Sequence, residues 1–312
     1  SVSGLGDVYK RQEQIIVGAG TEYLYGLLIQ LLGDDKIYGI ENPGYPKIAK
    51  IYDSMHVSYS AIDLDKHGVC IDSLENHQID IMHLSPSHHF PTGIITPISR
   101  RYELLGWASK DENRYIIEDD YDSELRLGGK PIPTLQSIDV SDKVIYMNTF
   151  TKTLSSTVRI SYMVLPASLT ELFYKKLSFY SCTVSNFEQY TLARFMESGS
   201  FEKHINRLRN YYQNKRDAIL EIFKTAPLNQ YITIKEEDSG VHFMMKLKTD
   251  RTEIDILSDA KSKGIKLAPL SKYFVGQTSN MSFQNVYVMN YSSIDLEQLP
   301  LIFDALCHIL MN

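Results

Sequence analysis

The sequence predicts an α/β fold: a mostly parallel sheet of seven strands with helices on both faces, followed by a smaller C-terminal α+β domain. Short apolar runs rich in β-branched residues alternate with segments of helical periodicity as far as Pro166. Beyond it the pattern changes, and a long amphipathic helix is predicted at 198–225. We therefore expect a large domain at residues 13–199, and an interdomain helix with a small domain at residues 200–312.

Composition places the chain among ordinary globular proteins. It has 312 residues, 43% hydrophobic and 22% charged, which is enough for a large core. The formal net charge of −6 and the sequence pI near 5.9 give no sign of a nucleic-acid surface. No apolar run reaches the roughly 20 residues of a membrane span. The three cysteines are far apart, with no CxxC pair, which indicates reduced thiols in a cytoplasmic protein.

The first twelve residues look foreign to the rest of the chain. They read SVSGLGDVYKRQ, and DVYKRQ is what the end of a common transposon-based sequencing adapter encodes in one frame. A strand is predicted to begin abruptly at Glu13, with nothing leading into it. We therefore treat residues 1–12 as non-native sequence, exclude them from the fold, and expect the natural protein to continue upstream.

The large domain is expected to alternate strands and helices in chain order. The first helix, at 21–33, should be capped by Thr21 and closed by Gly33. Proline and glycine in NPGYP mark a turn before the second helix. The seven strands are predicted at 13–20, 36–42, 57–63, 79–86, 114–120, 143–149 and 160–166, and further helices at 47–54 and 99–110.

The small domain follows the long helix. Its apolar runs lie at 241–247, 265–270 and 286–292, and helices are predicted near 253–263 and 296–310.

A lysine stands in an unusual polar stretch, TFTKTLSSTVR, which leaves a buried strand. An amine that forms a Schiff base must be neutral part of the time, and partial burial near another cation lowers its pKa. Lys152 has Arg159 seven residues on, while the hydroxyls of Thr149 and Thr151 add donors suited to a phosphate. A lone lysine would be read as a surface residue, but this combination favours a site.

A second polar stretch, IIEDDYDSELR, follows another buried strand. In an open parallel sheet, ligands bind beyond the carboxyl ends of the strands. A carboxylate held against a pyridine nitrogen keeps that nitrogen protonated. Because side chains alternate along a strand, Asp119 and Tyr121 share a face, and Tyr121 can donate a hydrogen bond to a phenolic oxygen of the ring. The alternative is a solvated acidic loop, which the apolar lead-in disfavours.

Two weaker signals agree with these. GAGTEY brings glycines to the start of a helix, where the amides of Gly20 and Thr21 can bind a phosphate. Tyr45, in the rigid turn NPGYP, can stack on a flat ring, although a lone tyrosine is more often part of a core.

Together these pieces resemble the fold type I pyridoxal 5′-phosphate (PLP) aminotransferases. More narrowly, they resemble the aminotransferase-like domain of MocR-type transcription regulators, in which a GntR-type winged helix precedes that domain. The narrower resemblance is carried by SPSHHFPTG, IIEDDYDSELR, VIYMNTFTKTLSSTVRISYMVLP and GIKLAPLSKYF. It extends from about Glu13 to the C-terminal end.

The resemblance assigns roles to the residues singled out above. Lys152 is implied to be the Schiff-base lysine, Asp119 to pair with the pyridine nitrogen, and Tyr121 to contact the phenolic oxygen. It also implies a homodimer and no metal ion. Tyr45 would stack on the ring, and the phosphate would be held by Thr149, Thr151, Arg159 and the amides of Gly20 and Thr21.

Two departures from the aminotransferase pattern concern ligand binding, and a third, Ser161 where glycine is typical, concerns packing only. Phe90 stands where an asparagine usually contacts the phenolic oxygen, and His88 or His89 is a candidate replacement, although a loop histidine is more often simply exposed. Val288 stands where an arginine usually grips the substrate carboxylate. Lys47 is a candidate substitute for that arginine, but a helix-surface lysine is the plainer interpretation.

Two functions from different classes follow, together with a plainer reading. The first is an effector-sensing domain, in which PLP is linked to Lys152 and a small amine, an amino acid or PLP itself shifts the conformation, while DNA is bound only through an N-terminal domain absent from this chain. The second is an active class I/II aminotransferase, with Lys152 as proton shuttle. The MocR-like phrases and the missing carboxylate-binding arginine favour the first, with transamination weak or absent. The plainer reading is an incomplete chain that folds poorly.

Overall fold

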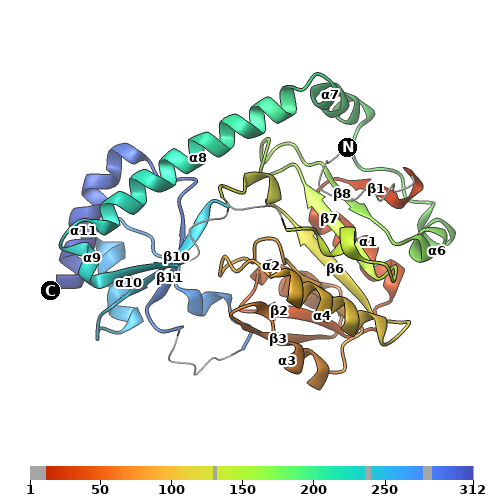
Figure 1. Ribbon diagram of the computed structural model, residues 1–312, viewed down its shortest axis with the longest axis horizontal. Coiled ribbons are helices and arrows are strands. Elements are labelled where there is room, and N and C mark those ends of the chain that lie inside the picture. Colours follow the sequence, from red (N-terminus) through yellow and green to blue (C-terminus); the bar gives the residue numbers. More distant parts are fainter. Residues whose placement is uncertain (1–11, 129–131, 236–239, 277–282, 312) are drawn as a thin grey trace.

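The computed structural model describes residues 12–128, 132–235, 240–276 and 283–311. It shows a large α/β domain and a smaller α+β domain, both flanked by the long helix α8, Ser200–Lys224 (Figure 1). The sequence interpreted as non-native lies outside the described residues, except for Gln12. Within the described residues, no helix is long and apolar enough to cross a membrane.

The large domain is built on a mixed sheet of eight described strands, in the order β1-β8-β7-β6-β5-β2-β3-β4. The central strands β3, β2, β5, β6 and β7 run parallel, whereas β8, β1 and β4 are antiparallel to their neighbours. All seven predicted strands are present, and the eighth is the two-residue β4. The bounds are β1 Ile15–Gly18, β2 Tyr38–Asn42, β3 Tyr59–Asp65, β4 Gly68–Val69, β5 Ile81–Leu84, β6 Tyr115–Asp120, β7 Val144–Thr149 and β8 Ser161–Val164.

Helices cover both faces of this sheet. One apolar cluster lies under α1, α2 and α6, and a second lies under α3, α4 and α5. The first helix begins differently from the prediction, because its N-cap is Gly20, whose φ of 99° suits glycine, and Thr21 caps nothing. Gly33 ends that helix as predicted. The bounds are α1 Thr21–Leu32, α2 Pro46–Ser54, α3 Ile71–Asn76, α4 Ile98–Ser109, α5 Leu135–Ile138 and α6 Ala167–Leu177.

The small domain packs helices on a three-stranded antiparallel sheet, in the order β11-β10-β9. The long predicted helix is present as α8, preceded by α7, Asn186–Glu197. Strand β9, Ile232–Lys235, was not predicted, and the apolar run at 265–270 forms no strand. The remaining elements are α9 Leu228–Tyr231, β10 His242–Leu247, α10 Glu253–Ser262, β11 Val286–Asn290, α11 Leu299–Met311, and the short 3-10 turns Gln12–Gln14, Ser123–Leu125, Leu270–Tyr273 and Leu296–Gln298.

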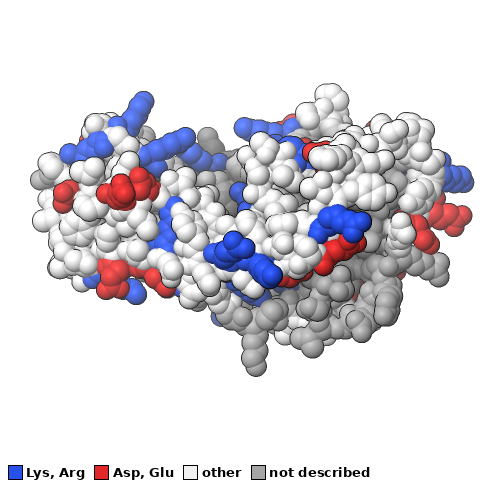
Figure 2. All heavy atoms as spheres, turned by 90° about the horizontal axis from the view of Figure 1, so that it is seen from above, with Lys and Arg blue, Asp and Glu red and all other residues white. Residues whose placement is uncertain are grey.

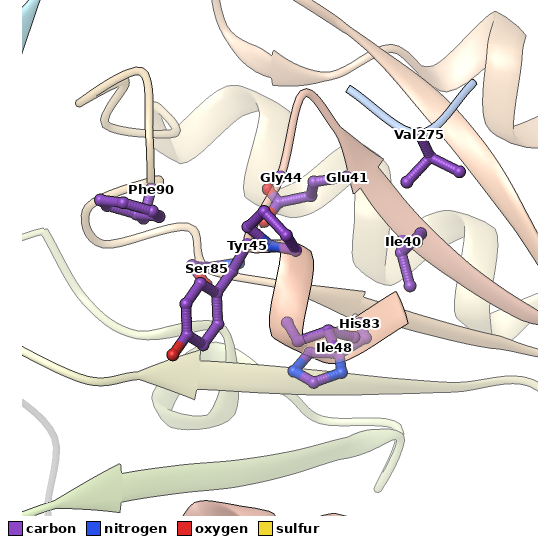
Figure 3. A pocket seen from close by; sticks show the side chains of 10 residues that line it. Ile40, Glu41, Gly44, Tyr45, Ile48, His83, Ser85, Phe90 and Val275 are labelled. Atoms are coloured by element: carbon purple, nitrogen blue, oxygen red, sulfur yellow. Dashed lines mark hydrogen bonds between the residues drawn. The ribbon is translucent and has the colours of Figure 1, made fainter. Parts of the chain in front are cut away.

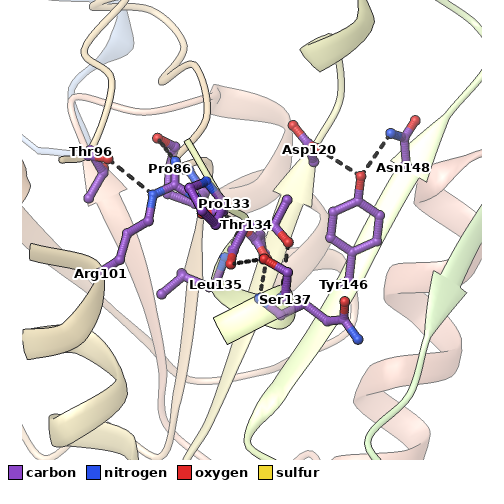
Figure 4. Close-up of polar contacts among 12 residues, drawn as sticks. Pro86, Thr96, Arg101, Asp120, Pro133, Thr134, Leu135, Ser137, Tyr146 and Asn148 are labelled. Carbon is purple, nitrogen blue, oxygen red and sulfur yellow. Dashed lines mark hydrogen bonds and ion pairs between the residues drawn. The ribbon is translucent and has the colours of Figure 1, made fainter. Parts of the chain in front are cut away.

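A buried ion pair fixes the loops at the carboxyl edge of the large sheet. Arg101 of α4 and Glu118 of β6 are both fully buried, with Nη1 and Oε1 3.4 Å apart. The same guanidinium donates to the carbonyls of Thr96, Pro86 and Pro133, at 3.1, 2.9 and 3.1 Å (Figure 4). Glu118 also accepts the backbone N–H groups that open α5, at 2.8 and 2.9 Å. Two loops, the one between β5 and α4 and the one that leads into α5, are thus fixed by one cation.

Replacing Arg101 should therefore be costly. In Arg101→Met the carboxyl group and three carbonyls lose their buried donor, so we expect the free energy of unfolding to fall by about 3–5 kcal/mol. The matched control is Arg194→Met, which removes an exposed pair with Glu197 and should cost no more than about 1 kcal/mol. Urea unfolding of both variants measures the difference, and equal small losses would contradict this account.

Candidate functional site

The carboxyl ends of β5, β6 and β7 meet at one edge of the large sheet. The parallel register sets Asp119 opposite Met147 and Asp120 opposite Asn148, so the acidic stretch ends beside the end of β7. Lys152 follows β7 in the next turn. The fold therefore brings the acidic stretch and the lysine stretch to the same edge, where open α/β sheets bind ligands.

Asp119 is a buried carboxylate with one oxygen satisfied. Its side chain accepts a hydrogen bond from the hydroxyl of Tyr25 in α1, and Oδ2 lies 3.7 Å from Nε2 of His83 in β5. Its other oxygen, Oδ1, is buried without a partner among the described residues. Asp120 contacts a different residue, the hydroxyl of Tyr146, at 2.7 Å. Of the two acids, Asp119 is therefore the one with an acceptor oxygen left for a ligand.

Tyr121 follows Asp120 at the end of β6. Its hydroxyl lies 3.3 Å from Nδ1 of His88, and the two rings are stacked with centroids 6.1 Å apart. Burial and the neighbouring carboxylates, Asp122 and Asp119 foremost, raise the pKa of Tyr121 well above its ordinary value. At neutral pH this side chain is a phenol that can donate one hydrogen bond.

In the turn that contains Lys152, the hydroxyl of Thr149 is buried and hydrogen-bonded, while the lysine amine is exposed. Thr149 accepts a hydrogen bond from Ser161 at 2.8 Å and donates to Thr151 at 2.9 Å. Lys152 is exposed, and its charge is near enough to help lower the pKa of His242 in the small domain. The amine therefore lies on the side of the large sheet that faces β10.

An anion cradle forms where α1 begins. A Cβ atom at Gly20 would lie 2.4 Å from Nη2 of Arg159, so the guanidinium occupies the space that glycine leaves. Arg159 Nη2 is 2.7 Å from Oε2 of Glu22, and Lys47 pairs with the same carboxylate. Burial opposes ionisation of Glu22, but the hydrogen bonds from Lys47 and Arg159 hold its pKa at about 2. Two cations and the amides at the start of α1 thus surround one anionic group.

Tyr45 lies at the rim of a pocket that also contains Glu41, His83 and Phe90 (Figure 3). Its ring is edge-on to Phe90, with centroids 5.8 Å apart, and 45% of the residue is exposed. His83 lines the same pocket as Tyr45 and also contacts Asp119. A single side chain, that of His83, therefore separates the pocket from the acidic stretch. Tyr45 is therefore not a core residue.

Three of the residues named at the departures from the aminotransferase pattern are buried: His88, His89 and Val288. His88 and His89 are only 2% and 1% exposed, so the plainer alternative of simply exposed loop histidines does not hold. Val288 is 7% exposed and packs in an apolar cluster that includes Phe90. Lys47 is exposed and pairs with Glu22, so it lies in the anion cradle and the plainer interpretation of a helix-surface lysine fits it better.

Glu41 is a buried acid behind Tyr45. Its Oε2 accepts the backbone N–H of Ser85 at 3.0 Å and lies 3.5 Å from Nε2 of His89. Burial raises the pKa of Glu41 to about 8, so the group is largely protonated at neutral pH. The pocket wall therefore offers a neutral carboxylic acid.

Sequence reasoning missed five residues of this site: Glu22, Tyr25, Glu41, His83 and His242. His83 could have been found from the sequence, because it is the one histidine inside the apolar strand IMHL. Glu22 and Tyr25 lie on an otherwise ordinary helix, and their partners Arg159 and Asp119 are 137 and 94 residues away along the chain. No local pattern signals such pairs. Among the described residues, no group of three His, Cys, Asp or Glu side chains is arranged to hold a metal ion.

Comparison with known proteins agrees with this fold. The profile of the family described as aminotransferase class I and II matches residues 6–292. A solved structure of a kynurenine aminotransferase from Pyrococcus horikoshii, in complex with PMP, superimposes with a TM-score of 0.79. That match covers 95% of this chain and 74% of the other, at 24% identity, and it shows the fold.

Two curated relatives are regulators by name. An uncharacterized HTH-type transcriptional regulator of Bacillus subtilis, YdeL, is 39% identical over 83% of this chain and 56% of its own length. The probable rhizopine catabolism regulatory protein MocR of Rhizobium meliloti is 28% identical over 91% of this chain and 56% of its own. The chain thus spans little more than half the length of these relatives.

Glu41 gives this site a testable pH dependence. Its pKa is higher in the folded chain, about 8, than its ordinary value of 4.5. Its contribution to stability is therefore complete below about pH 4.5 and is lost as the pH rises through 8. Glu41→Gln should remove that decline, so its stability relative to the unmodified chain should grow by up to about 1.4 kcal/mol per pH unit in this window.

The measurement is urea unfolding at a series of pH values. Glu171→Gln, a change at an exposed residue of α6, is the control and should keep the decline of the unmodified chain. A parallel decline in Glu41→Gln would show that the acid is ionised in the folded chain.

Proposed function

The chain belongs to the class I and II aminotransferase family, and we propose that within it this chain is the PLP-binding, effector-sensing part of a MocR-type transcription regulator. The observation that carries the cofactor proposal is the buried, unpartnered Oδ1 of Asp119 at the edge that also bears Lys152. The regulator rather than the enzyme is supported by Val288, buried among apolar side chains where a carboxylate clamp would be needed. The regulators among the relatives support it further.

The residues present fit the proposed cofactor. PLP, when bound, supplies a protonated ring that withdraws electrons from a linked amine. Oδ1 of Asp119 is free to accept the ring N–H, which would satisfy a buried acceptor. The phenol of Tyr121 is a donor for the ring oxygen, and the Tyr45 ring is accessible for stacking. The phosphate would be held by Gly20, Thr21, Thr149, Thr151 and Arg159.

The anion cradle has its own role in this proposal. Glu22 forms one ion pair with the guanidinium of Arg159 and another with Lys47. When a phosphate reaches Arg159, Lys47 can continue to neutralise Glu22, so the exchange leaves no unpaired carboxylate. Gly20 allows this close approach, because any side chain there would collide with Arg159.

Lys152 would hold the cofactor through its amine, and a small amine could compete with Lys152 for the same aldehyde. That competition needs no carboxylate clamp, whereas proton transfer needs the reacting carbon to be held in a fixed orientation, which a carboxylate clamp provides for an amino acid. Without a clamp, a substrate carboxylate forgoes charge-assisted hydrogen bonds of about 1.5–3 kcal/mol each. The proposed effector is a small amine, an amino acid or PLP itself.

The second candidate is an active class I/II aminotransferase. The presence of both Lys152 and Asp119 at one edge of the sheet favours the enzyme. These two groups suffice for acid–base chemistry at the carbon next to a linked amine. We rank it below the sensor because of Val288.

We further propose a cytoplasmic homodimer that binds DNA through a domain outside this chain. Helix α7 buries none of its residues and exposes Phe187 and Tyr190, at 81% and 73%, which supports an interface there. Seen from the side of α8, basic and acidic side chains are interspersed over the surface (Figure 2). The net charge of −6 likewise favours placing DNA contact elsewhere.

The cofactor assignment distinguishes Asp119 from its neighbour. Asp119→Asn should weaken PLP binding about tenfold or more and shift the visible absorption of the lysine-bound cofactor, because a charged acceptor is lost. Asp120→Asn, which alters the contact with Tyr146, should change the spectrum less. Lys152→Ala should abolish the band. A larger spectral change in Asp120→Asn would reverse the proposed orientation of β6.

The sensor proposal is tested by adding amino donors. The full-length, PLP-loaded protein is mixed with alanine, glutamate or aspartate, and the aminated cofactor is followed by absorbance and mass. We expect slow conversion or none, while the absorption still changes on amine binding. Rapid and complete conversion with any of the three would refute the sensor and establish the aminotransferase.

A further inference from the structure

Two buried histidines from different domains face each other near Lys152. His88 lies in the loop after β5, and His242 begins β10 of the small domain. Each is 2% exposed, and their ring centroids are 4.4 Å apart with planes at 32°. Nε2 of each ring is buried without a partner among the described residues. An unsatisfied buried nitrogen is costly, so two adjacent ones indicate a place for a ligand.

The protons on these rings can be placed from their partners. Nδ1 of His88 lies 2.8 Å from the carboxylate of Asp122, which can only accept, so Nδ1 carries the proton. Backbone atoms of Gly240 pack against this pair so closely that a Cβ there would lie 2.1 Å from the His88 ring. The ring is thus held in place, and in its neutral form Nε2 presents a lone pair.

The ring of His242 leads to the same conclusion. Burial, with the nearby His88, His89 and Lys152, holds the pKa of His242 well below its ordinary value, so the ring is neutral. The carbonyl of His89 accepts a hydrogen bond from one ring nitrogen, which leaves the other as an acceptor. His242 therefore offers an acceptor, and the neutral form of His88 offers a second one beside it.

The surroundings reject a carboxylate. Phe90 packs edge-on to His242, with centroids 5.2 Å apart, and belongs to the same apolar cluster as Val288. Asp122 is 3% exposed beside His88 and adds a negative charge. A carboxylate placed here would meet lone pairs, an acid and hydrocarbon, whereas an ammonium or hydroxyl group would find acceptors.

We propose that His88 and His242 form the subsite for the far end of the effector, and that this end is a hydrogen-bond donor. The inference rests on the proposed function, since the near end is the amine that replaces Lys152. The effector class is then a diamine or an amino alcohol, and not an amino acid with a distal carboxylate. Because one histidine comes from each domain, a bridging ligand holds the two domains together and converts binding into a change of conformation.

The test compares four probes of one chain length on the PLP-loaded protein. They are 1,4-diaminobutane, 4-aminobutan-1-ol, butylamine and 4-aminobutanoate, and their dissociation constants are measured by titration calorimetry. We expect the diamine or the amino alcohol to bind about tenfold or more tightly than butylamine, with 4-aminobutanoate weakest. The better of the two donors identifies the effector class as cationic or hydroxylic.

Variants assign the preference to the histidines. His242→Phe keeps an aromatic ring and removes the acceptor, so the ratio between the affinities for the best donor and for butylamine should fall to about one. His67→Phe, at an exposed turn, should keep the ratio.

Several results would overturn the subsite. Equal binding of all four probes by the unmodified chain, tightest binding of 4-aminobutanoate, or a ratio that survives His242→Phe would each do so with the cofactor band intact. Failure to acquire the cofactor band would instead overturn the proposed function and this inference with it. The ranking on the unmodified chain decides the question even if the variant does not fold.

Discussion

A carboxylate buried at the edge of a sheet needs a hydrogen-bond partner for each oxygen. At Asp119 the described residues supply partners for one oxygen only. Tyr25 donates to this side chain and His83 lies beside Oδ2, while Oδ1 is buried and free. Such an atom costs stability unless something binds it. The parallel register of β6 and β7 then matters, because it brings Lys152 to the same edge.

The second unsatisfied group lies across the domain interface. His88 and His242 come from different domains and each leaves a buried acceptor free. A ligand changes a conformational equilibrium only as far as it binds the two states differently. A molecule linked at Lys152 and held at both histidines interacts fully only when the domains are together, which is the differential affinity that a sensor requires. The apolar wall at Val288 and Phe90 provides no such grip for a carboxylate.

Much of this arrangement follows from local patterns. The seven strands were predicted because β-branched runs and turn residues are local signals, and the lysine and acidic stretches stood at strand ends. The predicted N-cap at Thr21 was wrong. The N-cap residue of α1 is Gly20, whose positive φ glycine adopts readily. The burial of His88 and His89 depends on β10, about 150 residues later in the chain, and no local pattern reports it. The same is true of Glu22, whose partner Arg159 is 137 residues away.

The most direct test of the central claim is to locate the covalent attachment. The chain is incubated with PLP, reduced with borohydride, digested and mapped by mass spectrometry. The account predicts the mass of the reduced cofactor on the peptide that contains Lys152. An adduct spread over exposed lysines such as Lys47, or no adduct at all, would contradict it.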